Sequence, residues 1–218
     1  MSALPSNLIP LHPERPRGPS KVLELPVGLS DAAIVAGLLA GQRDAGAALF
    51  DRYGALVHRV LVRVLGPDPE VHDLLQDVFV AALASIHRLE NAAALRGWLT
   101  QIAVFTARGR IRKRVRWRFL MFSPNDEMPE QEAIVAPAEI SEALKKTYSV
   151  LNQLKPDERI PFALRFIDGM ELTEVARACG TSLATIKRRL SRAQTRFVEL
   201  AEGEPALREW VEGRNDAH

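Results

Sequence analysis

The fold follows from ELTEVARACGTSLATIKRRLSRAQTRF, residues 171–197 of this 218-residue chain. This segment reads as a helix, a turn at Gly180 and a second helix that is heavily basic, which is the order of a helix-turn-helix. Gly180 stands where the chain must turn sharply, and glycine adopts left-handed backbone conformations without steric cost. Either Thr181 or Ser182 can cap the second helix. The segment therefore predicts a unit that binds DNA.

The second of these helices has a continuous apolar face and an exposed, basic one. Apolar side chains recur at spacings of three and four, as packing on a domain core requires; they are Leu183, Ile186, Leu190, Ala193 and Phe197. Small residues at the start of the other face can read base edges in a major groove while flanking cations hold phosphates. The candidate DNA-reading residues are Ser182, Ala184, Thr185, Lys187, Arg188, Arg189, Ser191 and Arg192. The alternative to DNA binding is that this basic face is simply solvated. The turn glycine and the apolar stripe favour DNA binding.

The composition of the chain excludes several classes of protein. Hydrophobic residues make up 47% of the chain and the net charge is only +2, so nucleic acid must be bound by local basic patches. Cys179 is the only cysteine, which excludes an intramolecular disulfide and a thiolate-rich zinc site; we expect a small buried side chain there. No segment reaches the roughly 18 apolar residues of a membrane span, and the N-terminal sequence lacks the apolar core of a signal peptide. We therefore expect a cytoplasmic protein.

The chain divides into two helical units and three other segments. Residues 1–28 carry six prolines without periodicity, which predicts a disordered tail. Residues 119–140 combine acids and prolines without any lysine or arginine, which predicts a flexible acidic linker. Residues 202–218 form a C-terminal tail. The predicted fold class is all-α, with two small helical domains at residues 30–118 and 141–201. Apolar periodicity places helices at residues 31–39, 45–65, 71–89 and 95–117, and breaks in the second domain at 155–157 and 168–169.

A polar and acidic helical face stands at the centre of the first domain. In EVHDLLQDVFVAAL, residues 70–83, the spacing puts Asp73, Gln76, Asp77 and Val80 on one face, with large apolar residues beside it. Such a face suits a protein docking site. From spacing alone, solvated acids over an ordinary core are the more favoured alternative.

A basic run, RGRIRKRVRWR at residues 108–118, ends the first domain without an acid in it. Such a run repels itself unless it meets a polyanion or solvent, and arginines all round a helix fit phosphate contact. Trp117 and Phe119 could stack on an unpaired base. The alternative is a solvated helix end whose cations favour the negative end of the helix dipole.

In this order, the segments resemble the extracytoplasmic-function group of bacterial sigma-70 transcription initiation factors, over about residues 45–118 and 141–201. LKPDERIPFALRFIDGMELTEVARACGTSLATIKRRLSRAQ, residues 154–194, is similar to the family's second domain. VHDLLQDVF at 71–79 and WLTQIAVF at 98–105 resemble two motifs of its first domain.

The resemblance implies that the two domains have separate binding roles and that the chain needs no catalytic residues, cofactor or metal. The first domain would dock on the coiled coil of the largest subunit of core RNA polymerase and hold the opened −10 promoter element, and the helix from Ser182 would read the −35 element. The acidic linker would lie in the polymerase's RNA path, and an anti-sigma partner would hold the protein inactive. The implied docking residues are Asp73, Leu74, Gln76, Asp77, Phe79 and Val80. The implied −10 contacts are Asn91, Arg96, Trp98, Gln101, Arg108, Arg112, Lys113 and Arg114.

The sequence departs from the family pattern at four positions. Phe105 and Gly109 stand where the family usually has Asn and an acidic residue on the −10 helix. In the reading helix, Ala184 replaces a common Gly and Arg188 a common Ser. Since Arg188 points outward, we expect it to alter the choice of −35 sequence.

Two other classes of protein compete with this prediction. A conventional helix-turn-helix regulator would explain the second domain only, and has no need of the segment from Asp73 to Phe79. An enzyme could use His58, His72 and His87 with the nearby aspartates as ligands or bases. These side chains do not share one helical face, and no metal, phosphate-loop or nucleophile motif accompanies them.

Overall fold

The computed structural model describes residues 29–121 and 142–202, which are helical with no strand among them. The first part contains α1 (Asp31–Leu39), α2 (Arg43–Leu65), α3 (Val71–Ser85), the short 3-10 turns η1 (Ile86–Arg88) and η2 (Ala92–Ala94), and α4 (Leu95–Met121). The second contains α5 (Glu142–Leu151), α6 (Pro156–Phe162), the π-helical turn η3 (Ala163–Ile167), α7 (Leu172–Ala178) and α8 (Leu183–Ala201). The predicted tail at 1–28, residues 203–218 of the predicted C-terminal tail and residues 122–140 of the predicted linker lie outside the described residues.

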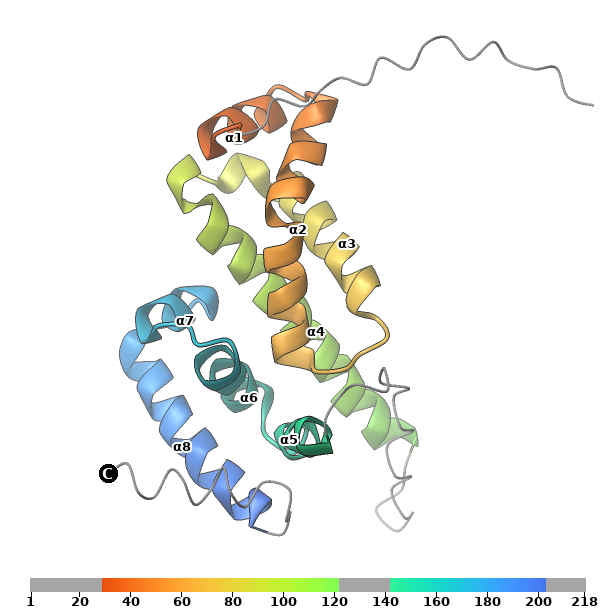
Figure 1. Cartoon of the computed structure of the whole chain (residues 1–218), viewed down its shortest axis with the longest axis vertical. Coiled ribbons are helices and arrows are strands. Elements are labelled where there is room, and N and C mark those ends of the chain that lie inside the picture. Colours follow the sequence, from red (N-terminus) through yellow and green to blue (C-terminus); the bar gives the residue numbers. More distant parts are fainter. Residues whose placement is uncertain (1–28, 122–141, 203–218) are drawn as a thin grey trace, which may run out of the picture.

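α2 is the central helix of the first part and packs against α1, α3 and α4 (Figure 1). Its side chains Leu49, Val57 and Leu61 are fully buried, as are Val78 of α3 and Leu99 of α4. This burial matches the apolar stripe that predicted the helices. α1 begins where Ser30 caps it, with its side chain accepting a hydrogen bond from the Ala33 amide.

The predicted helix ends are close to the observed ones, and the differences have local causes. α2 ends before Gly66, whose φ of 75° suits a residue without a side chain. α3 ends at Ser85, four residues before the predicted end, because the chain tightens there into η1. α4 extends to Met121, past the predicted end and into the segment assigned to the linker.

The second part is built around Phe162 and Phe197, whose stacked rings lie 4.8 Å apart. α6 passes into η3, which ends as predicted at the Asp168-Gly169 break. α7 starts with a reciprocal capping box between Glu171 and Glu174.

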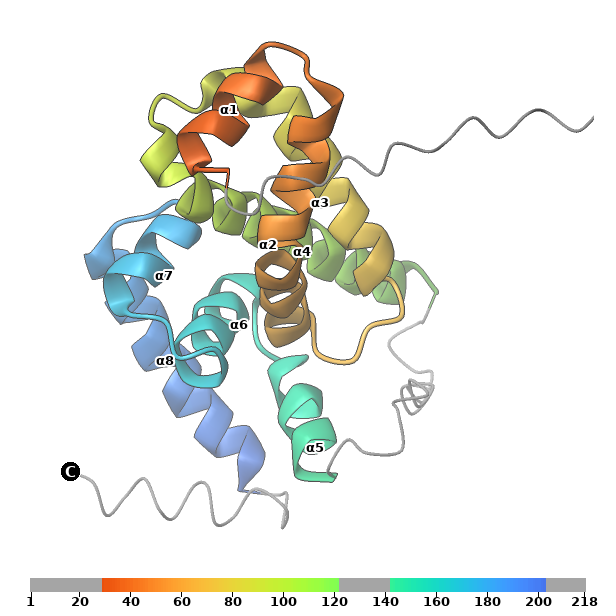
Figure 2. The same ribbon diagram turned by 45° about the horizontal axis from the view of Figure 1, so that its top comes forward.

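The two parts pack on each other, which the sequence did not predict. α7 and α6 lie against α4, and η3 lies against α2 (Figures 1 and 2). One continuous hydrophobic core runs through both parts. The fold class is the predicted one, two helical domains, and in this structure the domains are closed on one another.

Candidate docking and nucleic-acid surfaces

α3 carries an exposed face on the side of α2 away from α7 and α8 (Figure 1). Asp73, Gln76, Asp77 and Val80 are all exposed, so they share one accessible face as their spacing predicted. Val80 is 66% exposed, and Leu83, one turn further on, is 45% exposed. Two carboxylates therefore lie beside exposed apolar side chains on this face. We call this set of residues the α3 surface.

Leu74 and Phe79 have a different position from the rest of the predicted docking set. Their exposed fractions are only 8% and 7%, so they belong to the core and hold α3 in the bundle. The ring of Phe79 packs at 4.9 Å on the ring of Phe50, which is 45% exposed. Phe50 therefore brings an aromatic group from α2 to the rim of the α3 surface. Sequence reasoning missed it because its helix position alone does not reveal the contact with α3.

The helix-turn-helix has the predicted local geometry. Gly180 has a φ of 62°, and Cys179 before it is buried. Ser182 caps α8, with its Oγ accepting a hydrogen bond of 3.2 Å from the Thr185 amide. The Thr185 hydroxyl lies 2.9 Å from the same Oγ, so both polar groups at the helix tip are held in place.

The faces of α8 follow the prediction, with one exception. Ile186, Leu190, Ala193 and Phe197 are buried, whereas Leu183 is 37% exposed because it lies at the helix tip, beyond the core. Thr185 and Arg189 of the predicted reading set are half-buried. The exposed members are Ser182, Ala184, Lys187, Arg188, Ser191 and Arg192. The structure thus presents small residues at the tip of α8 with cations behind them.

On α4 and in the segment before it, the predicted −10 residues separate into accessible and engaged groups. Asn91 is exposed and its side chain accepts from the Ala93 amide; Arg96, Arg112 and Lys113 are exposed; and Trp98 and Gln101 are half-buried. Phe105 is 49% and Trp117 55% exposed. The side chains of Arg118 and Phe119 lie outside the described residues.

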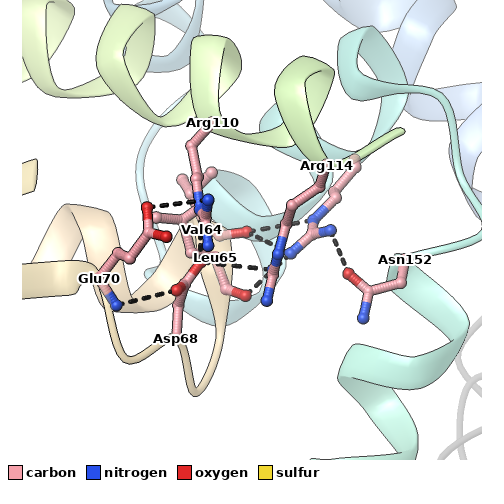
Figure 3. Close-up of polar contacts among 8 residues, drawn as sticks. Val64, Leu65, Asp68, Glu70, Arg110, Arg114 and Asn152 are labelled. Carbon is pink, nitrogen blue, oxygen red and sulfur yellow. Dashed lines mark hydrogen bonds and ion pairs between the residues drawn. The ribbon is translucent and has the colours of Figure 1, made fainter. Parts of the chain in front are cut away.

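Three arginines of the basic run pair with acids from other helices and loops, and Figure 3 shows two of them, Arg110 and Arg114. Arg110 lies 2.8 Å from Glu70 and 3.4 Å from Asp68, and Arg114 lies 3.3 Å from Asp68. The Asp68 side chain is fully buried. Arg108 lies 3.5 Å from Asp157 at the start of α6. The expectation that this run meets only a polyanion or solvent is therefore wrong for these three, because acids distant in sequence neutralise them.

Arg159 is the main polar residue that sequence reasoning missed. It is 2% exposed and donates to the carbonyl oxygens of Val64, at 3.2 and 3.1 Å, and Leu65, at 3.0 Å, and to the side chain of Asn152. These carbonyls end α2 and have no partner within the helix. No sequence signal pointed to Arg159, since the carbonyls that it binds are more than 90 positions away.

The remaining candidates are structural. Burial raises the pKa of Cys179 to about 11, in line with a buried, unreactive thiol. The rings of His58 and His72 lie 5.8 Å apart. Among the described residues, His, Cys, Asp and Glu side chains nowhere gather in threes or more as a metal site would need. Within the same residues, no helix has the length and apolar character to cross a membrane.

Both parts of the chain match known protein families. The family described as sigma-70 region 2 matches residues 49–117, and the family described as sigma-70, region 4 matches residues 144–196.

Curated relatives and a solved structure give the same result. The chain is 29% identical to the ECF RNA polymerase sigma factor SigX of Bacillus subtilis, over 64% of this chain and 74% of SigX. It is 25% identical to the RNA polymerase sigma factor CnrH of Cupriavidus metallidurans, over 80% of this chain and 96% of CnrH. The solved structure of CnrH in complex with the cytosolic domain of CnrY aligns with a TM-score of 0.55 and 23% identity, covering 80% of this chain and 98% of that one.

Proposed function

Since the chain belongs to the extracytoplasmic-function group of sigma-70 RNA polymerase sigma factors, we propose that three of its surfaces have separate roles in promoter-specific transcription initiation. The α3 surface docks on core RNA polymerase, the exposed face of α4 meets the −10 element, and the tip of α8 reads the −35 element. A conventional helix-turn-helix regulator does not account for the match to region 2.

The observation that carries the docking role is the exposed acidic and apolar face of α3. Asp73 and Asp77 lie beside Val80, which is 66% exposed although it is apolar. A partner that brings both cations and apolar groups would satisfy this face. Because Phe79 is buried, its loss would disturb folding, so a docking test must use the exposed residues.

The test is binding of the purified chain to bacterial core RNA polymerase by size exclusion. The Asp77→Ala, Val80→Ala double variant should lose stoichiometric binding. A matched control is Asp44→Ala, Leu39→Ala, which removes the same chemistry from exposed positions elsewhere on the first domain. Equal binding by both variants would reject the α3 surface as the docking site.

For DNA, we propose a smaller −10 set than the resemblance implies. Arg96, Arg112 and Lys113 are exposed and need no rearrangement to reach phosphates, and Trp117 can stack on an unpaired base. Gln101, Arg108 and Arg114 are partly covered within the closed chain. They can take part only after the contacts around them change.

We further propose that the chain catalyses no reaction itself and acts in the cytoplasm, where polymerase and promoter DNA are found. An anti-sigma partner would control it, as the resemblance implies, and the related CnrH has been solved bound to the cytosolic domain of CnrY. A protein that co-purifies with the tagged chain qualifies as this partner only if it blocks binding to core polymerase. We also propose that the domains span residues 30–118 and 141–201 and that the linker between them lies in the RNA path of the polymerase.

A further inference from the structure

An apolar groove opens on the second domain between η3, the start of α7 and the middle of α8, and we call it the α8 groove. Its apolar lining comes from Phe166, which is 37% exposed, and from Leu172 and Leu190. Arg165 and Lys187 add two cations to the lining. The groove holds about 250 Å³, less than the roughly 300–1,000 Å³ of a typical small-molecule site. Its size therefore suits one large side chain better than a cofactor.

The α8 groove borders the surface proposed to read DNA. Lys187 and Ser191, two exposed members of the −35 set, both line it. A group that fills the groove will therefore lie against part of that surface. The sequence of α8 has no acidic residue between Leu183 and Val198, so the helix favours an occupant that carries negative charge.

The chain itself contains a segment with matching chemistry. Residues 203–218 follow α8 and lie outside the described residues. Leu207, Trp210 and Val211 have the i, i+3 and i+4 spacing with which amphipathic segments anchor in apolar grooves. The segment also has four acidic residues and two arginines. It thus combines an aromatic anchor with a net negative charge, opposite in sign to that of α8.

The connection from α8 is long enough for this segment to return to the groove. Leu190 lies 11 positions before the end of α8 at Ala201, or about 16 Å along the helix axis at about 1.5 Å per residue. The nine positions from Ala201 to Trp210 reach up to about 30 Å at about 3.3 Å per residue. Gly203 and Pro205 disfavour a continued helix, as a reversal of the chain requires.

We propose that the α8 groove is the docking site of the C-terminal segment of this chain, residues 203–218, with Trp210 in the groove. Because the segment is joined to α8, its high effective concentration populates even a weak contact. The docked segment covers Lys187 and Ser191, so DNA must displace it to reach them. This competition with DNA rests on the proposed function, because it takes α8 as the −35 reading helix, whereas the docking itself does not.

Tryptophan emission measures the docking in the full chain without DNA or polymerase. In a Trp98→Phe, Trp117→Phe background, Trp210 is the only tryptophan left of three. An indole in an apolar groove is shielded from water. We therefore expect Trp210 of the folded chain to emit at shorter wavelength, and to be quenched less by acrylamide, than Trp210 of a free peptide of residues 203–218.

A groove variant and a matched control show whether the shielding comes from the α8 groove. Phe166→Ala and Phe105→Ala each remove an exposed phenyl ring, 37% and 49% exposed, and Phe105 lies on α4, outside the groove. Only Phe166→Ala should move the emission of Trp210 to longer wavelength and increase its quenching.

A second pair of variants avoids the loss of a packed ring, since Phe166 also contacts Phe162 at 4.8 Å. Lys187→Glu reverses the charge of an exposed groove residue, and Arg177→Glu does the same at an exposed position of α7 that does not line the groove. The acids of the C-terminal segment are repelled only by the first change. Lys187→Glu should therefore release Trp210, and Arg177→Glu should leave its emission unchanged.

DNA affinity measures the competition. Trp210→Ala should raise affinity for a duplex that the protein selects from a randomised pool by about twofold to tenfold, the range expected when a docked state held by one aromatic contact is lost. Trp210→Phe retains an aromatic ring and should bind DNA like the wild type. Equal affinities for Trp210→Ala and the wild type would reject the competition.

The same measurements can reject the docking site. Emission of Trp210 that equals that of the free peptide, or that neither Phe166→Ala nor Lys187→Glu changes, would reject docking in the α8 groove. If these two variants instead weaken binding to core polymerase and leave Trp210 unchanged, the groove belongs to the polymerase and the proposal is rejected. Failure of the proposed function would appear as absent binding to core polymerase and DNA, with Trp210 still shielded.

Discussion

At the scale of single residues, Arg159 has the largest expected effect on stability. Replacing it by Met keeps much of the volume and leaves the Val64 and Leu65 carbonyls buried without their donor. Such a change typically costs about 2–4 kcal/mol. Denaturant unfolding should show this loss for Arg159→Met. Arg177→Ala, at an exposed position of α7, should stay within about 0.5 kcal/mol of the wild type, and an equal loss in both would contradict the role assigned to Arg159.

Cys179 gives the stability of the second domain a dependence on alkaline pH. Burial raises its folded-state pKa from 9.0 to about 11, so its contribution is fully present below pH 9 and is lost as pH rises towards 11. We expect the free energy of unfolding of the wild type, relative to Cys179→Ala, to fall between those values by up to about 1.4 kcal/mol per pH unit. Urea titrations of both proteins at pH 8 and pH 10 measure the difference between their free energies of unfolding. A difference that is the same at both pH values would contradict this prediction.

At the scale of elements, the sequence predicted the helices well and their partners poorly. The turn at Gly180, the cap at Ser182 and the buried stripe of α8 all follow from local chemistry that neighbouring residues reveal. Asp68 pairs with Arg110, 42 positions away, and no periodic pattern encodes such a contact. Phe79 is buried, as the spacing of α3 favoured for its apolar residues, and only the family resemblance had placed it among the docking residues.

Arg188 of α8 is expected to influence which −35 sequence the protein prefers. Arg188 is exposed near the tip of α8, and a bidentate contact to one base typically contributes about 1–3 kcal/mol of discrimination. Arg188→Ser should therefore change the preferred −35 sequence at one position by about fivefold or more. Selection from a randomised duplex pool, read by sequencing, measures this. Arg196→Ser, at another exposed position about two turns further along α8, should weaken binding without changing the preferred sequence. Identical preferences for all three proteins would contradict the role of Arg188.

At the scale of the whole molecule, the two domains were predictable and their closure was not. Two basic helices and two runs of apolar periodicity lie in the sequence as separate units, and nothing local indicates that α7 packs on α4. The contacts between the domains join residues far apart along the chain: Arg59 with Asp168, Asp157 with Arg108, and Arg159 with the Val64 carbonyl. Both domains are net basic, and the acidic residues of segments 119–140 and 202–218 bring the net charge of the chain down to +2.

Closure held partly by ion pairs must respond to salt. The Debye length falls from about 10 Å at 0.1 M to about 3 Å at 1 M salt. Higher salt therefore weakens the ion pair of Arg59 with Asp168 and those of Asp157 with Arg108 and Arg189. The buried hydrogen bonds of Arg159 are little affected. Fluorophores on Asp44→Cys of α2 and Glu199→Cys of α8, both exposed positions, report the distance between the domains by energy transfer. This energy transfer should decrease from 0.05 to 0.5 M sodium chloride in the wild type and in the control Arg63→Gln, which removes an exposed positive charge from α2 one turn after Arg59. In Arg59→Gln it should start lower and change less. A wild type insensitive to salt would mean that Arg159 and the continuous apolar core hold the domains together without help from the ion pairs.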